Sequence, residues 1–214
     1  MLPTANRGAA TLSVVLLTHS NELFRVTNTG NLLLDPTSSF CKLCTRWTWQ
    51  GRKDNEAISR ALQSTPHPVL VWTDAPPATT DDASEHQGAS RTYIILDGTW
   101  QEAKKMFRQG PDTLRAIPRV ALRASFPSSY RLRQNFGYVD RFGDGGNGGG
   151  NGDGDDSRSS SNSNTHNLLC TAEVVAALLE LHGDTSGSTE VRKRLDHFQT
   201  TFCNKSYTYE THIT

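Results

Sequence analysis

Apolar runs alternate with amphipathic stretches along the chain. Runs rich in β-branched and aromatic residues predict short buried strands, at 12–17, 69–73 and 92–96, with a weaker one at 119–122. Stretches with helical periodicity or good helix formers predict helices, at 52–63, 100–109, 171–182 and 190–202. Gly183 would cap the third of these helices. Strands that alternate with helices indicate an α/β domain with a mostly parallel sheet flanked by helices.

Residues 143–167 interrupt this pattern. The segment, GDGGNGGGNGDGDDSRSSSNSNTHN, contains no apolar residue. Burial of apolar surface therefore cannot offset the conformational entropy that this segment would lose on ordering. We expect a disordered, low-complexity insertion. Surface insertions of this kind are tolerated thermodynamically, so we expect it to lie within a single domain that spans 1–214.

Global charge points to no partner, but the arginines are clustered. The formal net charge is zero and the isoelectric point is about 7.0. Between 113 and 142 Asp140 is the only acid, while six arginines occur: Arg115, Arg119, Arg123, Arg131, Arg133 and Arg141. Arginine suits planar contacts to phosphates and bases, so the cluster is compatible with RNA binding. The alternative is a set of solvated or salt-bridged surface side chains.

The four cysteines are too few for a disulfide scaffold and fit a reducing compartment better. Cys41 and Cys44 have zinc-knuckle spacing, but no second pair completes a site, so we favour a structural role and predict no metal. No apolar run approaches the roughly 20 residues of a membrane span. The N-terminal apolar run predicts a strand rather than a signal peptide. We expect an intracellular protein, in the cytoplasm or nucleus, with an organelle also open.

The stretch 93–105, YIILDGTWQEAKK, has an acid where a predicted buried strand ends. Ligands of open α/β sheets bind beyond the carboxyl ends of the strands, so Asp97 stands at a position suited to a binding site. Thr99 and Glu102 match a capping box for the following helix. A helix N-terminus suits a carboxylate or phosphate, and Trp100 adds an aromatic face. In the alternative, Asp97 forms a turn and Trp100 is a core residue.

A second helix start has a similar composition. Thr171 follows the apolar pair Leu168-Leu169 and predicts the N-cap residue, with Glu173 in the first turn. Capping and compensation of the helix dipole explain both residues. For Glu173, orientation of an active-site group is the alternative.

Several ordered motifs together resemble the DTW-domain family, which is named for its Asp-x-Thr-Trp motif. Asp97-Gly98-Thr99-Trp100 matches that motif, and Ala103 continues it. The stretch 12–33 resembles the first strand of the family, its His-Pro-x-Glu segment and its Asn-Thr-Gly turn. Five residues fall on these motif positions: His19, Glu22, Asn28, Thr29 and Gly30.

Two later segments extend the resemblance. Tyr130-Arg131-Leu132-Arg133 resembles the basic segment of the family, and 169–173 (LCTAE) resembles its Leu-Ser-Thr-x-Glu-Ala segment. The sequence departs from the family pattern at Ser20, where proline is usual, at Cys170, where serine is usual, and at Val174, where alanine is usual. The match covers roughly 11–182, without the insertion.

The resemblance implies a fold related to the knotted SPOUT class, with a C-terminal knot. It implies transfer of a 3-amino-3-carboxypropyl group from S-adenosylmethionine to N3 of a tRNA uridine, with methylthioadenosine as the other product. A carboxylate near N3 can accept its proton, so Asp97 is the predicted catalytic residue. The implied cofactor site comprises Thr29, Thr99, Trp100, Ala103, Leu122, Leu169, Thr171 and Glu173. The implied tRNA contacts are Arg123, Arg131, Arg133, Lys104 and Lys105.

Three alternatives remain open at this point. A SPOUT-like RNA methyltransferase would use the same cofactor and leave S-adenosylhomocysteine. The second alternative is an aminocarboxypropyltransferase that acts on ribosomal RNA, because no feature of the sequence specifically indicates recognition of tRNA shape. A non-catalytic RNA-binding paralogue would bind the cofactor or RNA without forming product.

Overall fold

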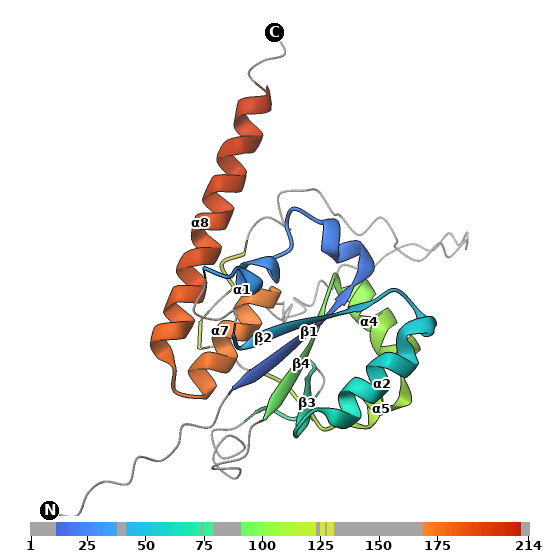
Figure 1. The fold of residues 1–214 in the computed structure, drawn as a ribbon. Coiled ribbons are helices and arrows are strands. Elements are labelled where there is room, and N and C mark those ends of the chain that lie inside the picture. Colours follow the sequence, from blue (N-terminus) through green and yellow to red (C-terminus); the bar gives the residue numbers. More distant parts are fainter. Residues whose placement is uncertain are drawn as a thin grey trace, which may run out of the picture.

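The computed structural model describes residues 12–37, 42–73, 75–78, 91–122, 125–126, 128–130 and 169–210. Within them, parallel strands form one five-stranded sheet in the order β2-β1-β4-β3-β5 (Figure 1). The strands are β1 (Ser13–His19), β2 (Cys44–Trp49), β3 (Pro68–Val71), β4 (Thr92–Asp97) and β5 (Arg119–Val120). The predicted α/β fold with a parallel sheet and flanking helices is confirmed.

The strand β2 was not predicted from the sequence. It lies at the edge of the sheet and pairs only with β1 among the described strands. Its sequence, CTRWTW, contains no continuous apolar run, which is why the pattern did not predict it. Of its six residues only the first and last, Cys44 and Trp49, are buried. Cys44 packs into the hydrophobic core, whereas Cys41 lies outside the described residues.

The helical segments are η1 (Ser20–Phe24), α1 (Asn31–Leu34), η2 (Arg52–Asp54), α2 (Asn55–Ser64), α4 (Trp100–Gln109), α5 (Asp112–Ala116), α7 (Thr171–Leu181) and α8 (Thr185–Glu210). The short segments η1, α1 and α5 were not predicted, and α8 is longer than the predicted 190–202. The predicted cap of α7 is confirmed. Gly183 has φ +81°, its N–H donates to the carbonyl of Glu180, and the N–H of Asp184 donates to that of Leu179.

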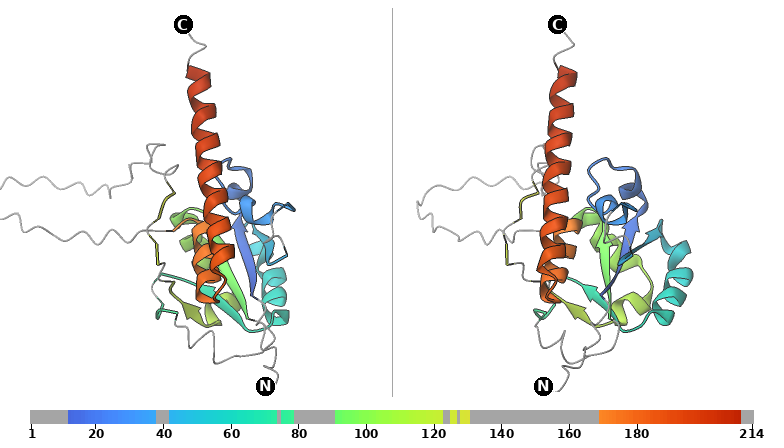
Figure 2. Two further views of the ribbon diagram at one scale, coloured as in Figure 1. Left: turned by 90° about the vertical axis from the view of Figure 1, so that its left-hand side faces the viewer. Right: turned by 60° about the vertical axis from the view of Figure 1, so that its left-hand side comes forward.

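Helices cover both faces of the sheet (Figures 1 and 2). Alternate residues of β1 point to opposite faces, so Val14 and Leu16 pack with α7 and α8, whereas Val15 and Leu17 pack with α2, α4 and α5. The α1 residue Leu33 joins the α7 side. The C-terminal part of α8 extends beyond the rest of the described structure (Figure 2).

The strand order of the sheet reverses between the central strands β1 and β4. After β1 the chain leads to β2 on one side, and after β4 it leads to β5 on the other side. The two connections also use opposite faces, because α1 packs on the α7 face and α4 on the other. Open α/β sheets bind ligands at the carboxyl ends of such strands. Thr18 of β1 and Asp97 of β4 pair in register at this edge.

Several predictions lie outside the described residues. The insertion 143–167 lies outside the described residues, close to where the implied C-terminal knot would form. Three of the predicted tRNA contacts, Arg123, Arg131 and Arg133, also lie outside the described residues. The knot, the disordered insertion and the single-domain organisation therefore stay predictions. Within the described part of the chain, none of the helices is both long and apolar enough to span a membrane.

Candidate active site

Asp97 is the last residue of β4 and lies buried where the two central strands end, with 1% of its surface exposed. Its carboxylate accepts hydrogen bonds from the hydroxyl of Thr18 at Oδ2 (2.9 Å) and from that of Thr171 at Oδ1 (2.7 Å). The amide nitrogen of Asn28 donates to Oδ2 at 3.4 Å. Three segments that are far apart in sequence thus meet at one carboxylate.

Thr171 reaches Asp97 because it does not cap its own helix. The N-cap of α7 is Cys170, and Thr171 is the first helical residue, so the prediction of Thr171 as N-cap is wrong. The Cys170 N–H donates to the Glu173 carboxylate at 2.8 Å, which closes the first turn. Thr171 can therefore turn its hydroxyl to Asp97. The next N–H of the helix, from Ala172, donates to the hydroxyl of Thr29 at 3.3 Å.

Glu173 caps α7 and also anchors the segment that leads to the basic motif. Its carboxylate accepts from the Ser129 N–H at 2.6 Å and from the Ser128 hydroxyl at 2.8 Å. Burial raises the pKa of the Cys170 thiol to about 12, and the neighbouring Glu173 charge contributes, so the thiol stays protonated at neutral pH. The contacts of Glu173 support the capping interpretation. No described hydrogen bond joins it to Asp97.

Polar atoms that lack a hydrogen-bond partner in the described part of the chain lie beside Asp97. The Nη2 atom of Arg46 lies 3.9 Å from Oδ2 of Asp97, and Nη1 donates to Asn31 at 2.9 Å. The Nε and Nη2 atoms of Arg46 and the Oδ1 atom of Asn28 are buried without a hydrogen-bond partner among the described residues. A Cβ atom on Gly30 would lie 2.9 Å from Asn28 Oδ1, 3.0 Å from Asp97 Oδ2 and 3.3 Å from Arg46 Nη2. Glycine at this position therefore allows the three side chains to converge.

A second, partly buried polar cluster lies at the start of α4. The Thr99 hydroxyl and the Glu102 carboxylate form the predicted capping box, which is confirmed. Both Nη atoms of Arg25 donate to Glu102 at 2.8 Å, and Arg25 also pairs with the buried Glu22. Although burial alone would raise the pKa of Glu102, the hydrogen bonds from Arg25 and Thr99 lower it to about 2. Glu102 is therefore ionised and fully engaged.

His19 belongs to this second cluster rather than to the Asp97 group. Its Nδ1 accepts from the Asn21 N–H at 3.2 Å and lies 3.6 Å from the Glu102 carboxylate. Burial lowers the pKa of His19 below its usual range, although Glu102 acts in the opposite direction. The imidazole is therefore neutral at neutral pH. Its ring packs 5.5 Å from that of Trp49.

Trp100 lies in an aromatic stack. Its ring stacks on that of Trp72 at 5.4 Å, and Trp72 also stacks on Phe107 at 4.7 Å. The Lys104 ammonium lies 4.7 Å from the Trp100 ring centroid, and that of Lys105 lies 5.9 Å from the ring of Trp49. The α4 residue next in the motif, Ala103, is buried, with 7% of its surface exposed. Trp100 is thus held at the carboxyl edge by aromatic packing.

The remaining predicted pocket residues lie on the α7 side of the sheet. Leu122 follows β5 and packs against the core that contains α7, and Leu169 is half-buried directly before Cys170. The structure therefore brings Asn28 and Thr171 to Asp97, places Thr29 one residue further on, at the Ala172 N–H, and leaves Leu122 in the neighbouring core. Sequence reasoning missed Thr18 and Arg46. Thr18 ends an apolar run as Asp97 does, which is a usable signal, but Arg46 lies in the strand that the pattern did not predict.

A sequence model of the DTW domain matches residues 3–136 of the 214. No solved structure matches the chain. The match covers more than half of the chain and includes the Asp97-Gly98-Thr99-Trp100 motif, which the fold places at the carboxyl edge of the two central strands. The chain belongs to the DTW-domain family.

Proposed function

We propose that this protein transfers the 3-amino-3-carboxypropyl group of S-adenosylmethionine to N3 of a tRNA uridine. The proposal combines the general association of the DTW family with this reaction and one observation. That observation is the buried Asp97 carboxylate, which Thr18 and Thr171 hold where β1 and β4 end. The site would act inside the cell, where tRNA is found. The C-terminal SPOUT-like knot is part of the same proposal.

The atoms beside Asp97 that lack a hydrogen-bond partner in the described structure fit the amino-acid end of S-adenosylmethionine. The Nε and Nη2 atoms of Arg46 form one edge of a guanidinium, a fork that suits a carboxylate. The Oδ1 atom of Asn28 is an acceptor that suits an ammonium. A buried donor or acceptor left unpaired costs roughly 1–3 kcal/mol, so a bound group that completes these contacts would bind favourably.

We propose that the motif residues hold the rest of the molecule. Thr171 already contacts Asp97, Thr29 accepts from the next N–H of α7, and Trp100 presents an aromatic ring at the same edge of the sheet. The proposed lining is completed by Thr99, Ala103, Leu122, Leu169 and Glu173. When bound, S-adenosylmethionine supplies the 3-amino-3-carboxypropyl group from its sulfonium and leaves as methylthioadenosine.

Asp97 would receive the proton of uridine N3. At neutral pH this nitrogen is protonated and a poor nucleophile, so a positioned base is needed as the N3–carbon bond forms and the carbon–sulfur bond breaks. A carboxylate offers about four acceptor positions. Among the described residues, Oδ2 accepts from Thr18 and Asn28, whereas Oδ1 accepts only from Thr171. Oδ1 therefore has room for a further donor, which we assign to uridine N3.

Mass spectrometry tests the reaction directly. The full chain is incubated with unmodified tRNA transcripts and S-adenosylmethionine, and both the nucleosides and the spent cofactor are measured. Aminocarboxypropyl-uridine together with methylthioadenosine is the expected result. A methylated nucleoside with S-adenosylhomocysteine would place the protein among RNA methyltransferases instead. The same assay on ribosomal RNA fragments separates the two RNA substrates, and cofactor binding without any product would support a non-catalytic paralogue.

A further inference from the structure

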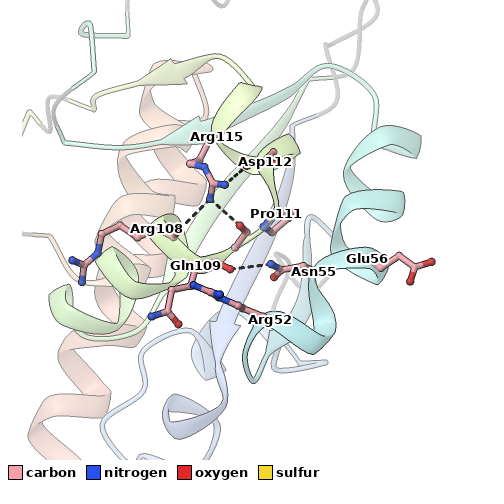
Figure 3. Close-up of a pocket in the computed structure, with 9 residues that line it drawn as sticks. Arg52, Asn55, Glu56, Arg108, Gln109, Pro111, Asp112 and Arg115 are labelled. Carbon is pink, nitrogen blue, oxygen red and sulfur yellow. Dashed lines mark hydrogen bonds and ion pairs between the residues drawn. The ribbon is translucent and has the colours of Figure 1, made fainter.

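A polar depression lies on the face of the sheet that α2, α4 and α5 cover (Figure 3). It has a volume of about 430 Å³, and its wall combines the start of α2, the end of α4 and the start of α5. Asn55 ties it to the carboxyl edge of the sheet. The Trp49 indole N–H donates to the Asn55 side chain at 3.2 Å, and Asn55 donates to the Gln109 carbonyl at 2.9 Å.

Most charges around this depression are already paired. Arg115 donates to the carbonyls of Phe107, Arg108 and Gly110 and pairs with Asp112, so it closes the end of α4 (Figure 3). The Glu56 carboxylate pairs with Arg60 at 3.3 Å. The Asp54 carboxylate, which precedes α2, accepts from the Gln50 N–H at 2.6 Å. The acids near the depression therefore have partners of their own.

Two cations of the wall have no such partner. Arg52 and Arg108 are exposed, and neither guanidinium makes a hydrogen bond or ion pair with another described residue. In Figure 3 the Arg108 side chain points away from Arg115. A guanidinium is always charged and presents planar donors that match phosphate oxygens. The depression therefore offers two free phosphate-binding groups in a polar recess.

A row of residues on α4 connects this recess with the candidate active site. Trp100, Lys104 and Arg108 are spaced four residues apart, so they lie along one face of the helix. Eight residues of helix span roughly 12 Å. The Lys104 ammonium lies over the Trp100 ring at 4.7 Å, in the direction of the motif. An RNA strand with its target uridine at Asp97 would thus have its backbone beside Lys104 and Arg108.

We propose that this recess binds phosphate groups of the RNA strand that flanks the target uridine, with Arg52 and Arg108 as the phosphate contacts. The inference rests on the proposed function. It adds Arg52 and Arg108 to the tRNA contacts that the family resemblance implies. Lys104 lies between the recess and Trp100 and would contact the same strand. Backbone contacts of this kind position the substrate without reading its sequence.

A binding assay tests the recess. Fluorescence anisotropy measures the affinity of the full chain for an unmodified tRNA transcript at several salt concentrations. Arg52→Ala and Arg108→Ala are each compared with Lys193→Ala, which removes an exposed positive charge from α8 on the other face of the sheet. Each arginine variant is expected to weaken binding about fivefold near 0.1 M salt and to reduce the salt slope by about 0.7–0.9. Lys193→Ala should bind like the wild type, and Arg108→Lys should regain most of the affinity.

The outcomes separate this inference from the proposed function. Wild-type affinity and salt slope in both arginine variants, with unchanged melting temperatures, would overturn the recess as an RNA site, as would a wild-type protein that binds no tRNA. Product formation by the wild type is measured independently by mass spectrometry. If both arginine variants lose affinity while the wild type forms no aminocarboxypropyl-uridine, the recess stands and the proposed reaction fails.

Discussion

The helices α4 and α7 both start at the carboxyl edge of the sheet, and both close their first turn with a glutamate, but they use their threonine hydroxyls differently. In α4, Thr99 is the N-cap and its hydroxyl is bound within the capping box with Glu102. In α7, Cys170 is the N-cap, and the hydroxyl of Thr171 donates to Asp97. A shift of the threonine by one position thus changes a capping group into a group of the candidate site.

The Asp97 carboxylate, which is buried, and the Glu102 carboxylate, which is partly buried, differ in the same sense. Glu102 accepts from Arg25 through both guanidinium Nη atoms and from Thr99, and these contacts lower its pKa to about 2. Asp97 accepts from hydroxyl and amide groups, and the nearest guanidinium atom, Nη2 of Arg46, is 3.9 Å away. We infer that Glu102 contributes to stability and Asp97 to chemistry, and variants of the two should separate these effects.

The largest effect is expected for Asp97→Asn. The amide has nearly the same shape as the carboxylate but cannot accept the N3 proton, and loss of a general base typically costs 10²–10⁴-fold in rate. We expect the initial rate of aminocarboxypropyl-uridine formation, measured by mass spectrometry, to fall by about that factor. S-adenosylmethionine binding, measured by calorimetry, should change little. A variant that keeps its rate within a few-fold of the wild type would exclude Asp97 as the base.

Glu102→Gln should reduce stability instead. The pKa of Glu102 is about 2 in the folded protein against an ordinary 4.5, so its ionised form stabilises the fold fully above about pH 4.5 and progressively less as pH falls toward 2. We expect the substitution to lower the free energy of unfolding by roughly 2–3 kcal/mol at pH 7. Urea denaturation at pH 7, 4.5 and 3 measures the difference. A difference between wild type and variant that stays constant over this range would contradict the assignment.

Thr171→Val and Thr99→Ala test the two threonines against each other. Valine preserves the shape of Thr171 but removes the donor to Asp97. We expect about a tenfold loss of rate and a loss of stability of roughly 1–3 kcal/mol, because the buried Oδ1 atom of Asp97 loses its described partner. Thr99→Ala removes a helix cap and should lower the free energy of unfolding by about 1 kcal/mol. Rates from the nucleoside assay and stabilities from urea denaturation give both quantities for each variant. A Thr171→Val variant that keeps its rate within a few-fold of the wild type would show that this hydroxyl does not support the chemistry.

Cys170→Ser should have the smallest effect. The pKa of the thiol is about 12, so a fraction on the order of 10⁻⁴ is ionised at pH 8, and burial shields it further. We expect Cys170 to resist iodoacetamide in the folded protein and to react after denaturation, as peptide mass spectrometry will show. Serine is itself a good N-cap, so the free energy of unfolding should change by less than about 0.5 kcal/mol. Rapid alkylation of the native protein would place the thiol in a more open environment.

The local parts of the candidate site were predictable. An apolar run that ends in Asp97, followed by Thr99 and Glu102 three residues apart, specifies a strand end and a capped helix from neighbouring residues alone. Gly183 likewise specified the end of α7. The N-cap at Cys170 was not predictable in this way, because Thr171 is the better cap by propensity. The tertiary hydrogen bond to Asp97 outweighs that local preference.

The sequence by itself therefore determined the order of the main strands and helices, the position of Asp97 at a strand end and the family of the chain. The tertiary structure alone decided which groups meet that carboxylate. Thr18 reaches it because β1 and β4 pair side by side, although 79 positions separate the two residues. Arg46 reaches it from an edge strand that has no apolar pattern. Contacts between distant segments depend on strand order and register, which local periodicity does not encode.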